Sequence, residues 1–339
     1  MGRDFQYPMG ILKKLQSKGV RCARGIYANF ARKGWAIHVA LLLVVMIGGI
    51  GLGVLYQPGT RTGSVPVPGQ KTPSNVTSNA RSNATGKIVG AVLPHHLLVA
   101  NFIDDFYAEL AKQIKPARII LISPNHFDKG VKYIQTATVT PNDQYNDLLD
   151  LQAINFLASK AGAFIENKYY SVEHGIYVHY PFIKKYFPQA QIIPITLKRG
   201  TPQAQMDKLI ADLQDLQKIE NKTTLILASV DFTHYVSEDI AAKNDQQTIA
   251  YFTQWASVES LRNNPAQVFA DLVRLSKSPK EQNPDAVAID SPESIYVMLN
   301  YLNDNGVHGF SLWKRTSTLS LTTLKDPNMN TSHIFGKFL

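Results

Sequence analysis

From residue 87 onward, short apolar runs alternate with amphipathic stretches, and this alternation limits the possible folds more than any other feature of the sequence. The strand-like runs cover residues 87–96, 117–126, 191–198 and 223–235. The helix-like stretches cover residues 98–114, 146–161 and 201–217, the last beginning at a Thr201 cap. Strands that alternate with helices predict an α/β domain, with a mostly parallel sheet covered by helices on both faces.

The last hundred residues modify this pattern. After residue 236 helices predominate as far as residues 292–306, and residues 309–321 then read as a late strand. We expect this strand at an antiparallel edge, which makes the sheet mixed. No internal repeat and no second linker divides residues 87–339, so we predict one domain there.

Residues 36–56 contain no Asp, Glu, Lys or Arg and are long enough to cross a hydrocarbon core of roughly 30 Å as a helix. Residues 1–35 hold eight Lys or Arg against one Asp. The positive-inside rule therefore predicts a cytoplasmic arm, a single transmembrane helix and an extracytoplasmic main domain at the cell membrane. A cleaved signal peptide is the alternative, but the arm is long and no A-x-A site follows.

Residues 57–86 are rich in Pro, Gly, Ser, Thr and Asn and predict a flexible, disordered linker. The net charge of +9 is concentrated before residue 87, so the main domain is nearly neutral and nucleic acid is not an expected partner. The single cysteine is Cys22, on the predicted cytoplasmic side. A metal site in the main domain must therefore use His, Asp or Glu.

Three of the predicted strands are followed by histidines at their carboxyl ends. His95 and His96 close the first, His126 the next, and His234 a later one. In an open α/β sheet, ligands bind outside the carboxyl ends of the strands, so these side chains are expected at one edge. Each histidine taken alone is explained as well by a strand cap or a loop hydrogen bond, but three coinciding ends favour a functional site.

A fourth segment, residues 171–182, contains Glu173, His174 and His179. The two histidines are five residues apart, which is not a same-face helical spacing, so His179 is expected to be structural or on the surface. The HExxH, GxSxG and GxxxxGK[ST] motifs are absent from the sequence, which leaves zincin, serine hydrolase and P-loop functions without support.

Four strings occur in order: LPHH, ISPNHF, VEHGIYVHYPFI and LASVDFTHY. They resemble the PHAGY, GPSHH, EHSIEVQLPF and SSDLSHY strings of the Memo family, also called AmmeMemoRadiSam system protein B. The resemblance covers roughly residues 87–339. The family is similar in fold to class III extradiol dioxygenases, which bind non-haem iron through two histidines and a carboxylate.

The resemblance implies that His95 and His126 are metal ligands and that His234 is an acid or base. Asp290 stands where the family has a cysteine ligand, so His95, His126 and Asp290 would form a 2-His-1-carboxylate set. That set favours a divalent metal ion, Fe(II) first, with copper or zinc as alternatives. The competing interpretation of Asp290 is an N-cap of the helix that follows it.

The remaining positions are less determined by the resemblance. Glu173 and His174 match a Glu-His pair of the family, which places His174 near the pocket as a second candidate catalytic residue. Asp231 is expected to orient a ligand histidine through its other ring nitrogen. His96 either points into the sheet or lies in contact with a ligand, and the family's next Glu and Gln are Tyr177 and His179 here.

The sequence thus predicts a membrane-anchored, metal-dependent, oxidoreductase-like protein that resembles extradiol dioxygenases. Two alternatives stay open: a non-catalytic module that binds a small molecule or peptide in the same cleft, and a zinc-dependent hydrolase. No residue pattern identifies a substrate.

Overall fold

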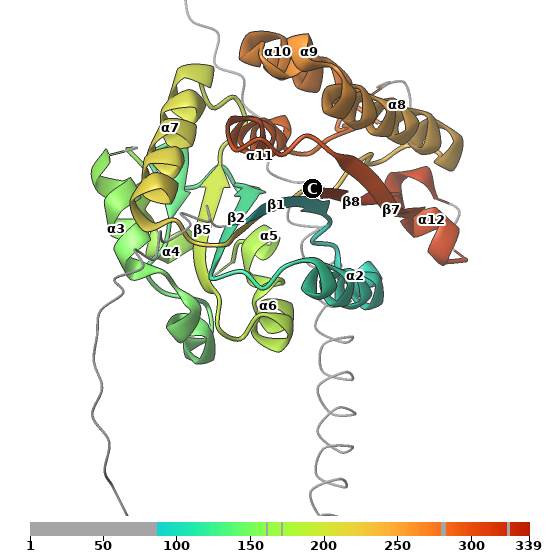
Figure 1. Cartoon of the computed structure of the whole chain (residues 1–339). Helices are drawn as coiled ribbons and strands as arrows, with labels where there is room; N and C mark the ends of the chain where they lie inside the picture. Colours follow the sequence, from blue (N-terminus) through green and yellow to red (C-terminus); the bar gives the residue numbers. More distant parts are fainter. Residues whose placement is uncertain (1–86, 161, 171, 279–282, 324–325) are drawn as a thin grey trace, which may run out of the picture. The chain divides into compact units, whose positions relative to one another are not determined.

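The computed structural model describes residues 87–160, 162–170, 172–278, 283–323 and 326–339. Its centre is an eight-stranded sheet in the order β4-β3-β5-β2-β6-β1-β8-β7, with helices packed on both faces (Figure 1). The strands are β1 (Ile88–Leu93), β2 (Arg118–Pro124), β3 (Ile134–Thr136), β4 (Phe164–Ile165), β5 (Gln191–Leu197), β6 (Thr224–Ser229), β7 (Phe310–Ser317) and β8 (Ser332–Phe338).

The helices connect these strands and cover them. They are α2 (Ala100–Gln113), α3 (Leu151–Lys160), α4 (Asn167–Tyr170), α5 (His174–Tyr177), α6 (Tyr180–Tyr186), α7 (Gln203–Glu220), α8 (Glu238–Ser257), α9 (Glu259–Arg262), α10 (Pro265–Leu275), α11 (Pro292–Asp304) and α12 (Thr318–Leu321). Three 3₁₀ turns complete the set: η1 (Leu97–Val99), η2 (Asp143–Leu148) and η3 (Pro327–Met329).

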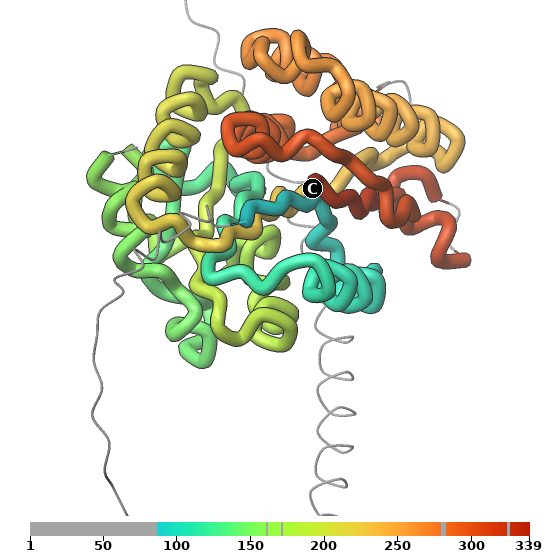
Figure 2. Tube along the Cα trace, viewed as in Figure 1, coloured from blue at the N-terminus to red at the C-terminus, as the bar shows by residue number. Residues whose placement is uncertain are grey.

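The four central strands β1, β6, β2 and β5 are parallel, so their carboxyl ends meet at one edge. β6 lies between β1 and β2, and the strands on either side of the parallel group, β3 and β8, run antiparallel to it. This order brings β1, β6 and β2, which are distant in sequence, side by side, and the chain can be followed through them in the tube of Figure 2. The prediction of a mixed sheet covered by helices is confirmed.

The sheet divides the core into two layers because successive strand residues face opposite sides. Val92 of β1 belongs to the layer formed with α3, α7, α8, α10 and α11. Val89, Ala91 and Leu93 of the same strand face the layer formed with α2 and the short helices α4, α5 and α6. Both layers consist of side chains that are almost fully buried, and together they fix the strand ends on which the site depends.

Several local expectations need correction. The late strand β7 is at an antiparallel edge, as predicted, but it pairs with β8, which the sequence analysis missed together with β3 and β4. Residues 146–161 are not one helix: η2 ends at Leu148 and α3 begins at Leu151. Thr201 does not cap α7, because its hydroxyl donates to the Lys198 carbonyl and Pro202 occupies the N-cap position.

All described residues fall within one compact unit. Among them, no helix combines the length and the apolar character needed to span a bilayer. The predicted arm at 1–35, the predicted span at 36–56 and the predicted linker at 57–86 lie outside the described residues.

Candidate metal centre

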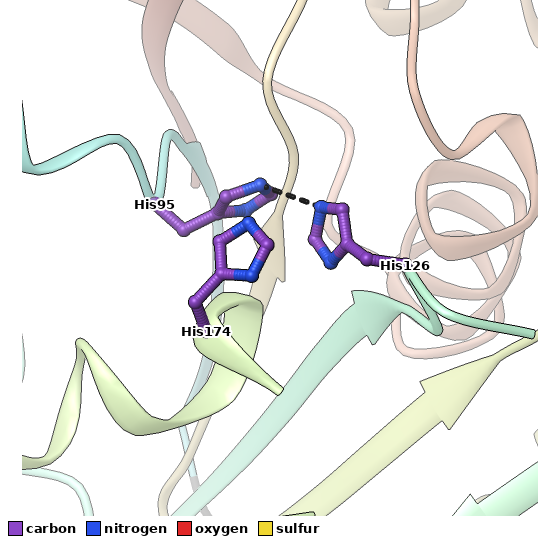
Figure 3. A group of neighbouring side chains, drawn as sticks. All are labelled: His95, His126 and His174. Atoms are coloured by element: carbon purple, nitrogen blue, oxygen red, sulfur yellow. Dashed lines mark hydrogen bonds between the residues drawn. The ribbon is translucent and has the colours of Figure 1, made fainter. Parts of the chain in front are cut away.

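Two histidines and one carboxylate converge at the carboxyl edge of the sheet. His95 follows β1, His126 follows β2, and Asp290 precedes α11. The Nε2 atoms of His95 and His126 are 3.0 Å apart (Figure 3). Asp290 Oδ2 lies 3.5 Å from His95 Nε2 and 3.7 Å from His126 Nε2. The three residues that the sequence analysis grouped are therefore brought together by the fold.

The tautomer of His95 follows from its buried partner Ser229, at the end of β6. Ser229 Oγ is 2.6 Å from the Gly175 carbonyl, which can only accept, so the single hydroxyl proton is donated there. His95 Nδ1 is 3.0 Å from the same Oγ and must be the donor of that bond. The proton of neutral His95 is thus on Nδ1, and the Nε2 lone pair points toward the centre.

His126 is oriented in the same manner by a carboxylate. Its Nδ1 is 2.6 Å from Glu173 Oε1, and its backbone N–H donates to Glu173 Oε2 at 2.9 Å. Glu173 is buried and also accepts the backbone N–H of Gly175 at 3.1 Å, which caps α5. A side chain at Gly175 would collide with Ser123 Oγ and approach the His126 ring to 3.2 Å, so glycine permits this close packing. The carboxylate holds the Nδ1 proton and directs Nε2 inward.

This arrangement suits a cation. With both protons on Nδ1, two Nε2 lone pairs face each other at 3.0 Å beside a carboxylate, and only a proton or a metal ion between them relieves the repulsion. Asp290 Oδ1 is buried and has no hydrogen-bond partner among the described residues. Neighbouring ligands of one ion with bonds of about 2.1 Å are themselves about 3.0–3.4 Å apart, close to the separations found here. The residues therefore fit a metal ion.

In the protein without metal, a proton takes this place. Burial by itself lowers the pKa of His126, but the nearby carboxylates of Asp290 and Glu173 outweigh it and raise the pKa to about 10. The pKa of His95 is held well below its usual value by burial and by the neighbouring His126. His126 is then the imidazolium and His95 the neutral acceptor of its proton.

Asp290 is not the cap of α11. The N-cap is Ser291, whose side chain accepts the backbone N–H of Ser294 at 3.2 Å. Asp290 Oδ2 instead accepts the backbone N–H of Asp231 at 3.2 Å. The alternative interpretation of Asp290 as a helix cap is wrong, and its other oxygen, Oδ1, is buried without a hydrogen-bond partner among the described residues.

His174, at the start of α5, adds a third imidazole. Its ring centroid is 4.0 Å from that of His126 and 5.2 Å from that of His95, and one ring nitrogen from each lies within 4.8 Å of the others (Figure 3). Burial and His126 lower the pKa of His174 to about 4, so it is neutral at pH 7. A three-histidine set is thus a geometric alternative to the set that contains Asp290.

His234 is held at the border of the centre by its backbone. Its N–H donates to the Val287 carbonyl at 2.8 Å, and Nδ1 donates to the Phe232 carbonyl. Burial lowers the pKa of His234, Asp290 raises it and His126 lowers it, so the ring is electrostatically linked to the centre. The net shift of the His234 pKa is downward, and its Nε2 has no hydrogen-bond partner among the described residues.

Asp231 does not have the expected role. Its Oδ1 accepts the His95 backbone N–H at 3.2 Å, and its Oδ2 is 3.5 Å from His95 Nε2, the inward nitrogen rather than the other one. The outer nitrogens are held by Ser229 and Glu173 instead. Burial and the nearby Asp290 raise the pKa of Asp231 well above its usual value. This carboxyl group is a further oxygen that faces the centre.

His179 is fully buried, so the structural interpretation is confirmed and the surface one excluded. Its Nε2 is 3.0 Å from Ser229 Oγ and its Nδ1 is 3.1 Å from the hydroxyl of Tyr107 on α2. Since Ser229 accepts, His179 donates from Nε2 and receives the Tyr107 hydroxyl at Nδ1. A buried chain of hydrogen bonds thus supports His95 from below, and the sequence carried no signal for Ser229 or Tyr107.

His96 packs against strand β8. Its ring stacks on that of His333 in β8, with centroids 5.3 Å apart and planes inclined by 23°. Burial, with a smaller contribution from His234, lowers the pKa of His96. Neither prediction for His96 described this contact, because β8 was not expected.

A cavity of about 80 Å³ opens beside the centre. It is lined by Pro124, Asn125, His126, Asp128, Leu197, Arg199, Asp290, Ser291 and Glu293. Two of the three grouped residues, His126 and Asp290, thus face a space that admits a few heavy atoms.

The fold and this cluster define an α/β protein with a histidine and carboxylate centre at the carboxyl edge of a mixed sheet. A family model described as Memo-like protein matches residues 72–317, well over half of the chain. The chain belongs to the Memo family, as the four strings in the sequence predicted.

Curated relatives agree with this assignment. A MEMO1 family protein of Pyrobaculum aerophilum is 28% identical over 49% of this chain and 60% of its own length, and one of Pyrobaculum arsenaticum is 29% identical over 48% and 59%. The chain thus spans about 60% of these relatives. A crystal structure of an uncharacterized Escherichia coli K12 protein aligns at 14% identity over 74% of this chain and 99% of its own, with a TM-score of 0.46.

Proposed function

We propose that this Memo-family domain binds one divalent metal ion through His95 Nε2, His126 Nε2 and Asp290, and that it is a metal-dependent oxidoreductase. The observation that carries the proposal is the pair of inward Nε2 atoms 3.0 Å apart, with Asp290 Oδ2 at 3.5 and 3.7 Å from them. Two histidines and one carboxylate are the ligand set of non-haem Fe(II) enzymes, so Fe(II) is the favoured metal. When bound there, the metal supplies open positions for a substrate or for oxygen.

The chain's own residues supply proton transfer and orientation. His234 is neutral at pH 7 with its proton on Nδ1, so Nε2 can accept a proton from a bound substrate. Ser229 and Glu173 hold the two ligand rings by their outer nitrogens and prevent them from rotating. Carboxylate in place of the family's cysteine leaves no thiol in the site to be oxidised.

Elemental analysis of the purified full chain tests the metal. We expect one equivalent of a transition metal in the wild type and less than a tenth of it in His126→Ala or Asp290→Asn. His308→Ala is the matched control, because His308 lies outside the cluster. A wild-type chain that binds no metal after incubation with Fe(II), Cu or Zn would overturn the proposal and favour the binding module.

A zinc-dependent hydrolase is the second candidate, and the three-histidine group His95, His126 and His174 favours it. The two ligand sets differ in one residue. If His174→Ala abolishes metal binding and Asp290→Asn does not, the three-histidine site is correct; the reverse result supports the site with Asp290.

We further propose that residues 36–56 anchor the chain in the cell membrane with the main domain outside. The uncharged apolar stretch and the basic arm before it support this proposal. Alkaline carbonate extraction of membranes tests the anchor, and protease treatment of intact cells tests its orientation. Release by carbonate, or a main domain protected from external protease, would contradict it.

A further inference from the structure

Exposed apolar side chains gather beside the metal centre. Leu97 and Leu98 follow the ligand segment at the end of β1, Phe127 directly follows His126, and Val172 directly precedes Glu173. Each of the four is between 44% and 51% exposed. They come from three different segments but share one edge of the sheet, so this edge carries an apolar rim.

The loop at residues 125–133 extends the rim and adds charge. Val131 is 82% exposed, the most exposed large apolar residue in the described part of the chain, and Tyr133 is exposed as well. Lys129 and Lys132 alternate with these residues, and their ammonium groups form no ion pair with a described residue. Apolar tips interleaved with unpaired cations are typical of segments that enter the surface of an anionic bilayer.

The loop is held in place from inside, so its exposure is not a sign of missing structure. Gln135 Nε2 donates to the carbonyls of Lys129 and Lys132 at 2.6 and 2.8 Å. Asn125 exchanges two hydrogen bonds with the backbone of Lys129. Gly130 adopts a φ of +79° beside the Gln135 amide, where a side chain would collide. The apolar tips are presented outward by a pre-formed loop.

We propose that this loop docks the domain on an anionic lipid surface, with Phe127, Val131 and Tyr133 inserted and Lys129 and Lys132 at the headgroups. Lys198 adds a third cation, since its ammonium donates to the Gly130 carbonyl and has no carboxylate partner among the described residues. Asp128 is the acidic residue of the loop, which leaves its net charge positive.

The proposal rests in part on the proposed anchor, because residues 36–56 would keep a bilayer near the domain. The thirty residues from 57 to 86, fully extended, would reach roughly 100 Å, far enough for the loop to touch that bilayer. Since His126 stands at the root of the loop, docking would open the metal centre toward the lipid interface. The substrate class is then a molecule that partitions into membranes.

The single cysteine makes a direct test simple. On a Cys22→Ser background of the full chain, Val131→Cys carries an environment-sensitive fluorophore, and Ile219→Cys near the end of α7 is the matched control, an exposed apolar residue far along the chain from the loop. The chain is reconstituted in phosphatidylglycerol or phosphatidylcholine vesicles that contain doxyl-labelled lipid.

We expect a blue shift and lipid quenching for the label at residue 131, and neither at residue 219. Replacing Lys129 and Lys132 by Gln, or the anionic lipid by phosphatidylcholine, is expected to lower the ratio of docked to undocked loop by roughly fivefold per lysine. Equal signals at the two positions, or quenching that ignores the charge of both lysine and lipid, would overturn the proposal.

Two further results separate the causes of failure. Carbonate extraction of the same vesicles reports on the anchor alone, so a released chain contradicts the anchor whatever the label does. If carbonate leaves the chain in the vesicles but the fluorophore at residue 131 reports a polar environment in every lipid, the docking proposal is overturned and the anchor is retained.

Discussion

Replacing Glu173 by Gln is expected to weaken metal binding without touching a ligand. Glu173 accepts three hydrogen bonds, from His126 Nδ1 at 2.6 Å, from the His126 backbone at 2.9 Å and from Gly175 at 3.1 Å. An amide of the same shape has one acceptor oxygen, so its NH₂ group must face at least one of these donors. A buried donor without a partner costs about 1–3 kcal/mol.

Part of this free-energy cost arises because the His126 ring is held less firmly in the orientation that binds the metal. Loss of an outer hydrogen bond of this kind lowers metal affinity about 10- to 100-fold, which corresponds to about 1.4–2.7 kcal/mol. We therefore expect the Kd of Glu173→Gln for Fe(II) or Zn(II), measured by competition with a chromophoric chelator at neutral pH, to rise by that factor. Thermal unfolding by circular dichroism verifies that the variant is folded.

The control is Glu259→Gln, the same change at an exposed position in the first turn of α9. Its Kd should equal that of the wild type. If a folded Glu173→Gln variant binds metal within threefold of the wild type, the orientation of His126 does not depend on the carboxylate, and the reasoning about the centre is refuted.

Three other predictions concern the same domain. Burial lowers the pKa of His126, but Asp290 and Glu173 raise it to about 10, so metal binding at this ring displaces a proton. The metal affinity measured by calorimetry should therefore rise about tenfold per pH unit between about pH 6 and 9. An affinity that does not change with pH would contradict this. Ser291→Ala removes the cap of α11 and should cost about 1 kcal/mol in urea unfolding, with metal stoichiometry unchanged. Burial raises the pKa of Asp150, but the hydrogen bond from Arg118 outweighs burial, and the net shift of the pKa is downward. The ion pair therefore stabilises the fold fully above about pH 4, and this stabilisation is lost as the pH falls through the pKa of Asp150 in the folded protein. Asp150→Asn should therefore lower the free energy of unfolding by about 3 kcal/mol at pH 7, and the stability of the variant should depend less on pH in the acid range. Equal acid sensitivity of the wild type and the variant would contradict this.

The sequence located the ends of β1 and β2 to within three residues because each is marked twice, whereas the run predicted to end at residue 235 is β6, which ends at Ser229. β1 and β2 are apolar runs, and each is closed by Pro and His within a few residues. Periodicity and the rule for open α/β sheets then suffice to bring His95 and His126 together. Asp290 was located by the family pattern, and only the geometry of Ser291 distinguishes its role from that of a cap.

What the sequence could not predict depends on packing between distant segments. Ser229, Tyr107 and His179 meet only because β6 inserts between β1 and β2 and α2 crosses beneath them. Asp231 was assigned to the wrong nitrogen because spacing along a chain does not specify which ring atom a side chain approaches. β8 is mixed in composition, and its burial comes from its two antiparallel neighbours.

The interleaved strand order would also couple the proposed metal ion to folding. The atoms of His95, His126 and Asp290 meet only when β1, β2 and α11 have all assembled, so an unfolded or partly folded chain offers scattered side chains with weak affinity. An ion held by the native state alone shifts the unfolding equilibrium by mass action, by about 2.7 kcal/mol when its free concentration is a hundred times Kd. A bound metal ion would thus distinguish folded from misfolded chains, since a chain that failed to assemble its sheet would also fail to retain the ion.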